Sequence, residues 1–270
     1  MNLLFTVDRN YQKLLETCLK SVFRFPREEG YDVYILHSDF SEEECETFRQ
    51  KFAGQEENRF HFLYVDPEFF HSFPEPAGYP KTIYYRILAS FFLPDSLERI
   101  LYLDPDTVII RPLDELYGRD MEDRLFIACS HTRKLLSGIN SLRLGMQENL
   151  PYINTGVMML NLELLRKEQS VRQILEYVEK KGKAFWLPDQ DIVTALYGDR
   201  ILLEDSLKYN LSDRILAFHM PELGTKEEAL AWVKEHTVVI HYCGKNKPWL
   251  PGYKGWLGTY YQEIEEQKNP

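Results

Sequence analysis

Two aspartates, Asp104 and Asp106, stand one residue apart directly after an apolar run from Ile100 to Leu103, and a second apolar run from Val108 to Ile110 follows them. Short apolar runs bounded by charged residues are typical of buried strands. Two carboxylates at the carboxyl end of a strand suit a hard divalent cation, which takes oxygen ligands and keeps positions open for phosphate. Asp-Pro-Asp is equally good turn chemistry, so the stretch alone does not distinguish a metal site from a turn.

Far down the chain, His241 ends an apolar run that begins at Val238 and precedes a basic loop with Gly244, Lys245 and Lys247. A histidine at a strand end can bind a metal, and the backbone N–H groups and lysines of such a loop can hold phosphate oxygens. A lone histidine is more often a hydrogen-bonded core residue. Together with the two aspartates, however, it forms an oxygen and imidazole set that suits Mn²⁺ better than Ca²⁺, with Mg²⁺ as the alternative ion.

Further polar residues follow the first predicted strand and interrupt a later apolar segment. Asp8, Asn10 and Tyr11 offer hydrogen bonds and an aromatic face for a base. Arg86 lies within an apolar stretch, so its charge requires either an internal carboxylate or an anionic ligand. We favour a functional role for this arginine because the aspartate pair is in the next predicted element.

Two more groups suit sugar hydroxyls. Asn154 opens an apolar strand ahead of Gly156, where the missing side chain lets another group approach the backbone. Asp189, Gln190 and Asp191 begin a predicted helix, and the helix dipole alone accounts for one acidic residue there but not for the cluster. A metal, a phosphate-binding loop, a base-stacking ring and hydroxyl-binding side chains together indicate a nucleotide sugar. The metal and a lysine would stabilise the departing diphosphate, where negative charge grows as the sugar bond breaks.

Hydrophobic patterning predicts the elements that must position these residues. Strands are expected at Leu3–Val7, Asp32–Leu36, Phe60–Val65, Ile100–Leu103, Val108–Ile110, Leu125–Cys129, Ile153–Asn161 and Ile201–Leu203, and from Val238 up to His241. Helices are expected at 11–23, 41–52, 81–92, 170–181, 188–197, 226–235 and 256–266. Strands that alternate with helices predict an α/β fold with a parallel, doubly wound sheet. Without a linker or repeat, the chain is predicted to be one domain over residues 1–270, with the helix at 256–266 packed on it.

Two segments have no such regular pattern. Residues 67–80 contain four prolines and three phenylalanines, and we interpret them as a loop able to close over a site. Residues 131–150 are mixed in character and indicate no particular element. These two segments are therefore the least predictable part of the chain.

Composition restricts the classes of partner. Lys and Arg number 32 and Asp and Glu 42, which gives a formal charge of −10, and such a balance argues against nucleic acid as a general partner. Four widely separated cysteines indicate free thiols in a reducing compartment. No apolar run approaches the roughly 20 residues of a membrane helix. We therefore expect a cytoplasmic protein with no transmembrane segment and at most peripheral contact with the inner face of a membrane.

Six stretches, in order along residues 3–250, resemble the family 8 glycosyltransferases of the GT-A fold. Within that family the chain is most similar to bacterial lipooligosaccharide α-galactosyltransferases and their glucosyltransferase relatives. The matching stretches are Phe5-Thr-Val-Asp-Arg-Asn-Tyr11, Tyr84-Tyr-Arg86, Leu101-Tyr-Leu-Asp-Pro-Asp106 with its Asp-x-Asp (DXD) motif, Ile153-Asn-Thr-Gly-Val157, Asp189-Gln-Asp191 and His241-Tyr-Cys-Gly-Lys-Asn-Lys-Pro-Trp249. Each is weak alone, but six in the family's order are specific.

The resemblance implies a GT-A fold with a mixed, mostly parallel, Rossmann-like sheet. It also implies retaining transfer of galactose or glucose from a UDP-sugar, with Mn²⁺, to an acceptor hydroxyl on a cell-surface glycan such as lipopolysaccharide. Thr6, Asp8, Asn10 and Tyr11 would hold the uridine; Asp104, Asp106 and His241 the metal; Gly244 and Lys247 the diphosphate; Arg86, Asn154 and Asp189 the donor sugar. Gln190 matches the position below the anomeric carbon, and with Asp189 and Arg86 it would make up the catalytic group.

Three features of this chain bear on the mechanism and on the acceptor. Glutamine is a poor nucleophile, so same-face attack and a covalent intermediate both remain open. The family has an acidic residue shortly after the strand that ends at Cys129, and this chain has His131 nearby instead. The chain ends in an acidic segment, 263–270, in place of a basic membrane-associating tail, which weakens the case for a lipid-linked acceptor.

Two other functions also fit part of the pattern. In a haloacid-dehalogenase-type phosphatase, Asp104 would be the nucleophile and Asp106 the general acid. That motif usually opens its domain, whereas here three predicted strands precede it. A non-catalytic nucleotide-sugar-binding protein on the same fold is the second alternative, and it would bind a UDP-sugar without hydrolysing or transferring it.

Overall fold

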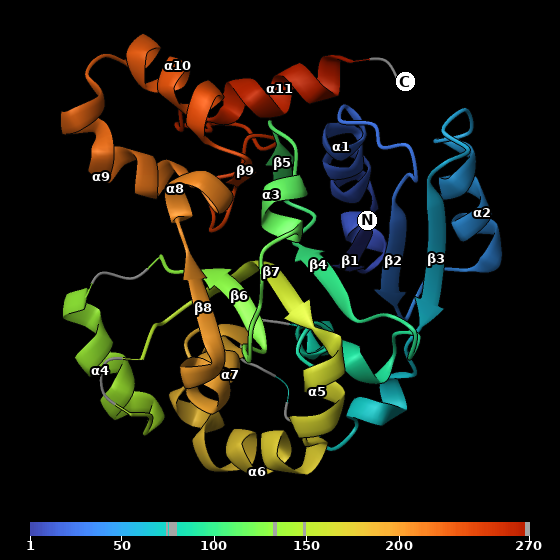
Figure 1. Ribbon diagram of the computed structural model, residues 1–270, viewed down its shortest axis with the longest axis vertical. Helices are drawn as coiled ribbons and strands as arrows, with labels where there is room; N and C mark the ends of the chain where they lie inside the picture. Colours follow the sequence, from blue (N-terminus) through green and yellow to red (C-terminus); the bar gives the residue numbers. More distant parts are fainter. Residues whose placement is uncertain (74, 76–79, 132–133, 148–149, 268–270) are drawn as a thin grey trace.

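A seven-stranded sheet forms the centre of the molecule in the computed structural model (Figure 1). The structure describes residues 1–270 except 74, 76–79, 132–133, 148–149 and 268–270, and except the side chains of 134–137 and 220–221. Across the sheet the order is β3-β2-β1-β4-β7-β6-β8. These strands are β1 (Asn2–Thr6), β2 (Asp32–His37), β3 (Arg59–Tyr64), β4 (Arg99–Leu103), β6 (Phe126–Cys129), β7 (Asn154–Asn161) and β8 (Ile201–Glu204).

The sheet is mixed and mostly parallel, as predicted. Strands β1, β2, β3 and β4 pair in parallel, as do β6 and β8, whereas β7 runs antiparallel to both β4 and β6. Because β7 is reversed, its first residue, Asn154, lies at the edge where β1 and β4 end. Polar residues that follow two strands and open a third are thereby brought to one edge of the sheet.

Alternate residues of the strands enter two separate cores, one on each face of the sheet. In β4, Ile100 and Tyr102 belong to the core that includes residues of α5 (Leu162–Glu168), α6 (Val171–Lys181) and α7 (Pro188–Tyr197). Leu101 and Leu103 belong to the core that includes residues of α1 (Gln12–Phe23) and α2 (Glu42–Gln50). Strands buried on both faces are typical of doubly wound sheets with helices on either side.

A second, two-stranded sheet places His241 beside the aspartate pair. Strands β5 (Thr107–Ile109) and β9 (Val239–His241) pair antiparallel, with Thr107 opposite His241. They share a third core with α9 (Asp213–Leu223), α10 (Lys226–His236) and α11 (Gly258–Glu266), which lie together in Figure 1. The pairing brings the end of the ninth strand next to Asp106, although 134 residues separate Thr107 from His241.

The prediction of one helix over residues 81–92 is wrong. The structure has two short 3-10 helices there, Lys81–Tyr84 and Ala89–Phe91, joined by turns. Ile83, Tyr84, Tyr85, Ile87 and Leu88 are all buried in the first core. A segment buried on almost every side has no polar face to fix a helical period, so tertiary packing decides its backbone.

Other predictions of elements had mixed outcomes. Every predicted strand is present, and a capping box of Ser41 and Glu44 begins α2, in the helix predicted at 41–52. Helices α4 (Lys134–Leu144), α5 and α9 were not predicted. In the predicted loop 67–80, residues 67–70 form a 3-10 helix, and the proposed closing part at 74 and 76–79 lies outside the described residues. The remaining elements are α3 (Asp114–Tyr117) and α8 (Ser206–Tyr209).

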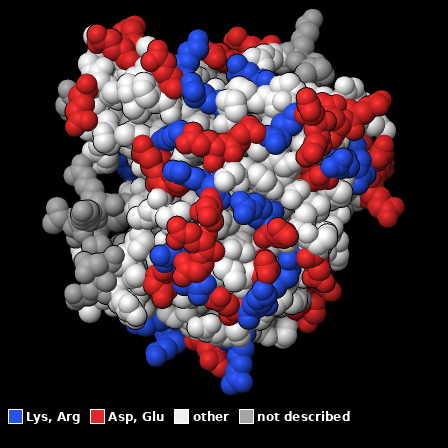
Figure 2. Space-filling view, in the orientation of Figure 1, with Lys and Arg blue, Asp and Glu red and all other residues white. Residues whose placement is uncertain are grey.

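The surface carries charge of both signs. On the face in Figure 2, groups of Lys and Arg are interspersed with larger groups of Asp and Glu, in keeping with the net charge of −10. Among the described residues, none of the helices has the length and apolar character that crossing a bilayer requires.

Candidate active site

A cavity of about 260 Å³, called here the first cavity, opens at the edge where β1 and β4 end and β7 begins. Most of the predicted site residues line it: Thr6, Asp8, Tyr11, Arg86, Asp104, Asp106, Asn154, Asp189, Gln190, His241 and Gly244. Of the predicted residues, Asn10, Asp191, Lys245 and Lys247 do not line it. Segments from six distant parts of the chain therefore meet as the sequence predicted.

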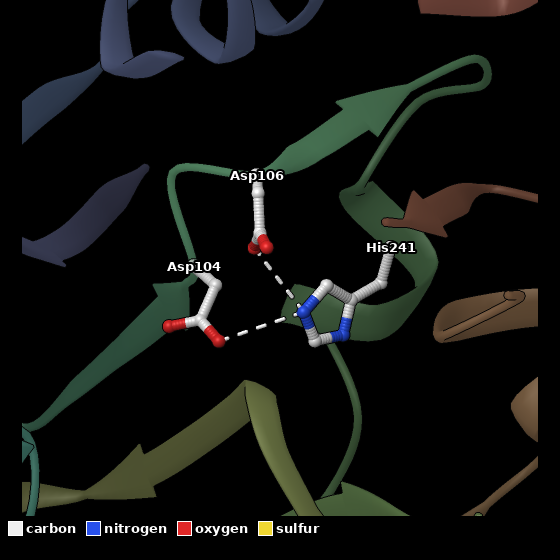
Figure 3. A group of neighbouring side chains, drawn as sticks. All are labelled: Asp104, Asp106 and His241. Atoms are coloured by element: carbon white, nitrogen blue, oxygen red, sulfur yellow. Dashed lines mark ion pairs between the residues drawn. The ribbon is translucent and has the colours of Figure 1, made fainter. Parts of the chain in front are cut away.

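The three predicted metal ligands form one cluster (Figure 3). Nε2 of His241 lies 3.5 Å from Oδ2 of Asp104 and 3.2 Å from Oδ1 of Asp106, and one ligand atom from each residue lies within 4.8 Å of the others. Two carboxylate oxygens and an imidazole nitrogen match the donor set expected for Mn²⁺. Burial alone would raise the pKa of Asp106, but the adjacent His241 and Lys247 hold that pKa below its usual value.

Gly156 provides the space for this cluster. A Cβ atom at this position would lie 2.2 Å from Cε1 of His241 and 2.8 Å from Oδ2 of Asp104. The prediction that this glycine allows a close approach is thus confirmed, and the approaching group is the imidazole ring. No other amino acid fits here without moving two of the three candidate ligands.

Arg86 has internal carboxylate partners. Its Nη1 lies 2.8 Å from Oδ1 of Asp104 and 3.3 Å from Oδ2 of Asp189, and its guanidinium stacks 4.8 Å from the ring centroid of Tyr102. The hydroxyl of Tyr102 also donates to Oδ1 of Asp104 at 2.6 Å. Arg86 thus connects Asp104 to Asp189 at the start of α7, and all three residues line the cavity.

The Asp-Gln-Asp stretch at the start of α7 divides between two environments. Asp189 and Gln190 line the first cavity, and the Thr155 hydroxyl donates to Oδ2 of Asp189 at 2.6 Å. Burial raises the pKa of Asp189 above its usual value. Asp191 is fully buried and lines neither the first cavity nor a second cavity that is described below. The expectation that Asp191 offers a polar group to sugar hydroxyls is therefore wrong.

The residues predicted to hold uridine surround the end of β1. Asp8 caps the 3-10 helix Arg9–Tyr11 by accepting from the Asn10 N–H at 2.8 Å. The Tyr11 ring lines the cavity and is 45% exposed, which leaves a face available for stacking. Asn10 is exposed and does not line the cavity. Thr6 is buried, and its hydroxyl lies 3.2 Å from the Tyr102 hydroxyl.

The basic loop after β9 is tied to the metal cluster. Nζ of Lys247 forms an ion pair with Asp106 and donates to the Tyr242 carbonyl at 2.7 Å. Gly244 has a φ of +89°, a left-handed conformation that favours glycine, and its backbone borders the cavity. The lysine is thus near the cluster but neutralises one of its carboxylates in this structure.

Asn210 is a site residue that the sequence did not reveal. Its side-chain oxygen lies 2.9 Å from Nδ1 of His241, and its amide donates to Oδ1 of Asn154 at 3.0 Å. Since an amide oxygen only accepts, Nδ1 carries the hydrogen and the lone pair of the neutral ring is on Nε2, which faces the two aspartates. Asn210 follows the four-residue helix α8, where no motif marks it.

A second cavity, of about 640 Å³, adjoins the first. The two share Asn154, Gln190 and His241, and the second extends toward His131 and Trp186. Burial lowers the pKa of His131 to about 3, so this residue is a neutral ring in the wall. The two cavities thus meet at Gln190.

Comparisons with known proteins identify relatives over most of the chain. The model of the family described as Glycosyl transferase family 8 matches residues 2–251. A putative glycosyltransferase of Haemophilus influenzae is 25% identical, over 92% of this chain and 73% of its own. A lipopolysaccharide 1,2-glucosyltransferase of Escherichia coli is 24% identical, over 97% of this chain and 77% of its own.

A solved structure has the same arrangement of elements. The galactosyltransferase LgtC, in complex with donor and acceptor sugar analogs, superposes with a TM-score of 0.81 and 25% identity, over 98% of this chain and 95% of its own. The mixed seven-stranded sheet and its flanking helices therefore form a single-domain GT-A fold. The predicted fold class is confirmed.

Proposed function

Because the chain belongs to glycosyl transferase family 8, we propose that it transfers a hexose, galactose or glucose, from a UDP-sugar to a hydroxyl of a saccharide acceptor with retention of configuration. The observation that carries this proposal is the cluster of Asp104, Asp106 and His241 within 4.8 Å, placed in a cavity with Tyr11 on one side and Gln190 on another. The phosphatase alternative is not favoured, because the family match covers nearly the whole chain.

In this proposal the three clustered residues hold Mn²⁺, which supplies positive charge to the departing diphosphate. Mg²⁺, which shares the preference for carboxylate oxygen but binds imidazole less readily, is the alternative. Thr6, Asp8, Asn10 and Tyr11 hold the uridine, with Tyr11 stacking on the base. Gly244 and Lys247 contact the diphosphate. For Lys247 this requires its amine to leave Asp106, a carboxylate that the metal also uses.

Arg86, Asn154 and Asp189 orient the donor sugar, and Gln190 lies beside its anomeric carbon. We assign retention to attack from the face that the diphosphate leaves: the acceptor hydroxyl forms the new C–O bond while its proton passes to the leaving phosphate oxygen. Two contacts support this route. Arg86 and Thr155 both hold Oδ2 of Asp189, which weakens that carboxylate as a nucleophile, and Asp191 does not reach the cavity.

The acceptor would enter through the second cavity, whose wall includes Gln190. Because similar proteins include lipopolysaccharide glucosyltransferases, we propose that the acceptor is part of a bacterial cell-surface glycan and that transfer takes place in the cytoplasm, at most in peripheral contact with the membrane. UDP-sugars are the donor class, and the choice between galactose and glucose is left to the experiment.

A thermal-shift and hydrolysis panel tests the proposal. UDP with Mn²⁺, each at about a hundred times its dissociation constant, should raise the melting temperature by about 5–10 °C. Asp104→Asn and His241→Ala should abolish this rise, whereas the exposed Asp95→Asn should keep it. UDP-glucose, UDP-galactose and their N-acetyl and uronate analogues then identify the donor by slow hydrolysis. A wild type that neither UDP nor Mn²⁺ stabilises would refute the assignment, and binding without any turnover would favour the non-catalytic alternative.

A further inference from the structure

Asp191 is the centre of a buried anchor. Its Oδ1 accepts from Nη2 of Arg143 and from the Tyr152 hydroxyl, each at 2.7 Å. Its Oδ2 accepts from Nη1 of Arg143 at 2.8 Å and from the backbone N–H groups of Trp186 at 2.7 Å and Leu187 at 3.2 Å. Five donors around one carboxylate leave it no lone pair for a substrate, so its role is to fix the chain around it.

Arg143 connects this anchor to the exposed ring of Trp186. Besides its two bonds to Asp191, the guanidinium donates to the Ala184 carbonyl at 2.8 Å and to Oδ1 of Asn140 at 3.0 Å. Its Cζ lies 4.2 Å from the centroid of the Trp186 ring. One face of the indole therefore rests on a planar cation whose own position is set by buried bonds.

Trp186 differs from the other tryptophans of the chain. Trp232, Trp249 and Trp256 pack against the third core, whereas Trp186 is 63% exposed. Its backbone is nevertheless tied to the buried Asp191 carboxylate. A large apolar ring that is exposed yet held rigidly loses little conformational entropy when it binds a ligand, a property typical of binding surfaces.

The ring borders the second cavity, whose lining combines apolar residues such as Ile139 and Leu187 with several amides. Asn140 lies on the same wall, and Gln190 and Asn154 mark the junction with the first cavity. A flat aromatic ring beside amides is suited to a pyranose, whose C–H face is apolar and whose hydroxyls form hydrogen bonds. Indole, amides and a volume of about 640 Å³ fit a saccharide with more than the single accepting unit.

We infer that Trp186, held in place by the Asp191–Arg143 anchor, stacks on a pyranose ring of the acceptor in the second cavity. The inference rests on the proposed function, since it takes the ligand beside Gln190 to be a saccharide. In it, Trp186 is a specificity-determining residue and Arg143 a positioning residue. The second aspartate of the Asp-Gln-Asp stretch thus serves the acceptor side, while the first serves the donor side.

Binding to an array of immobilised saccharides and glycolipids, with UDP and Mn²⁺ present, tests this subsite. Trp186→Ala should weaken saccharide binding about three- to tenfold, and Trp186→Phe should restore part of the loss. Tyr64→Ala is the matched control, because Tyr64 is also 63% exposed but lines neither cavity. Arg143→Lys keeps a positive charge beside Asp191 but removes the planar support, so it should weaken saccharide binding without reducing the thermal shift given by UDP and Mn²⁺.

The outcomes separate this inference from the function on which it rests. A wild type that hydrolyses UDP-sugars but binds no saccharide, or a Trp186→Ala variant that binds as strongly as Tyr64→Ala, overturns the subsite alone. Binding that depends on the acyl chain and tolerates any sugar overturns it too, in favour of a lipid. A wild type with neither hydrolysis nor a UDP-dependent thermal shift removes the proposed function, and the subsite with it.

Discussion

The two edges of the central sheet each hold an aspartate, an arginine and a histidine, yet the two groups differ in burial and in the balance of charge. At the amino-terminal edge, Asp32 on β2 accepts from Nε of Arg59 at 2.7 Å and lies 2.9 Å from Nε2 of His61, both on β3. One carboxylate faces two partners. The Arg59 side chain is 56% exposed, so water reaches this group.

At the carboxyl-terminal edge, three carboxylates share two cations. Asp104, Asp106 and Asp189 face Arg86 and Lys247. The three aspartate side chains are 17%, 13% and 7% exposed, and those of Arg86 and Lys247 are 14% and 19% exposed. Negative charge in excess at a buried site is costly unless a further cation binds. The comparison shows that residue types alone do not mark a site: a surplus of partly buried carboxylates beside a cavity distinguishes the metal edge from the merely structural one.

The largest expected effect comes from filling the space beside His241. In Gly156→Ala the new methyl group would lie 2.2 Å from the imidazole and force it away from the aspartates. A displacement of about 1 Å at a catalytic centre can cost about a hundredfold, so UDP-sugar hydrolysis should fall at least that far and the Mn²⁺-dependent thermal shift should disappear. Hydrolysis rates and melting curves measure both effects.

Gly138→Ala is the matched control for this substitution. Gly138 lies within α4, and among the described residues no atom outside the helix's own backbone lies within 4 Å of a Cβ there. Replacing a glycine in a helix interior should stabilise the fold by about 0.5–1 kcal/mol and leave hydrolysis unchanged. If Gly156→Ala bound Mn²⁺ as tightly as Gly138→Ala, the close packing of Gly156 against the ligands would have no functional importance.

The next largest effect should separate the two aspartates of α7. Asp191→Asn places an amide among five donors and leaves Arg143 without a full countercharge, so the free energy of unfolding should fall by about 3–5 kcal/mol. Asp189→Asn should cost less stability, because Arg86 keeps its contact with Asp104. It should nevertheless lower donor hydrolysis strongly. Urea denaturation and hydrolysis assays on both variants decide the matter, and equal stability losses would contradict the division of roles.

The donor side of the site was largely predictable because its residues stand at strand ends. Hydrophobic runs predicted every strand, and the ends of parallel strands share an edge, so Asp8 and Asp104 could be placed together without coordinates. His241 required more. Its position beside Asp106 depends on the antiparallel pairing of β5 with β9, which no local pattern encodes. The sequence grouped His241 with the aspartates through ligand chemistry and the family resemblance, without predicting that pairing.

The acceptor side was not predictable for a physical reason. Its wall includes Asn140 and Trp186, which Arg143 and the buried Asp191 hold from outside the cavity lining through helix packing and single buried hydrogen bonds. Such contacts leave no periodic trace in the sequence. Asp191 itself was taken for a sugar-binding group, because a pattern shows that carboxylates cluster but not which way each one faces.

A smaller effect is expected from the residue that orients His241. Asn210→Ala removes the acceptor at Nδ1 and frees the ring to change its tautomer and position. Loss of such an outer partner typically weakens metal binding about 10–100-fold, and calorimetric titration with Mn²⁺ would measure it. Asn140→Ala, which removes another buried asparagine, should leave Mn²⁺ affinity unchanged. Equal affinities for the two variants would show that the rest of the pocket already fixes the imidazole.

The smallest effect belongs to the amino-terminal edge and appears only in the pH dependence of stability. The Arg59 guanidinium, with help from His61 and against a smaller effect of burial, lowers the pKa of Asp32 from 3.8 to about 2. A lowered pKa in the folded state means that the stabilisation is complete above about pH 4 and is lost as the pH falls through 2. Because solvent screens the half-exposed pair, we expect the ionised carboxylate to add only about 1–2 kcal/mol to the free energy of unfolding.

The wild type should therefore melt at a higher temperature than Asp32→Asn at pH 6, and the difference between their melting temperatures should vanish near pH 2. It should be the same with and without UDP and Mn²⁺, because this edge has no part in binding. A difference between the two proteins that stayed constant with pH would mean that the ionised carboxylate contributes nothing, and the contrast between the two edges would then rest on packing rather than on charge.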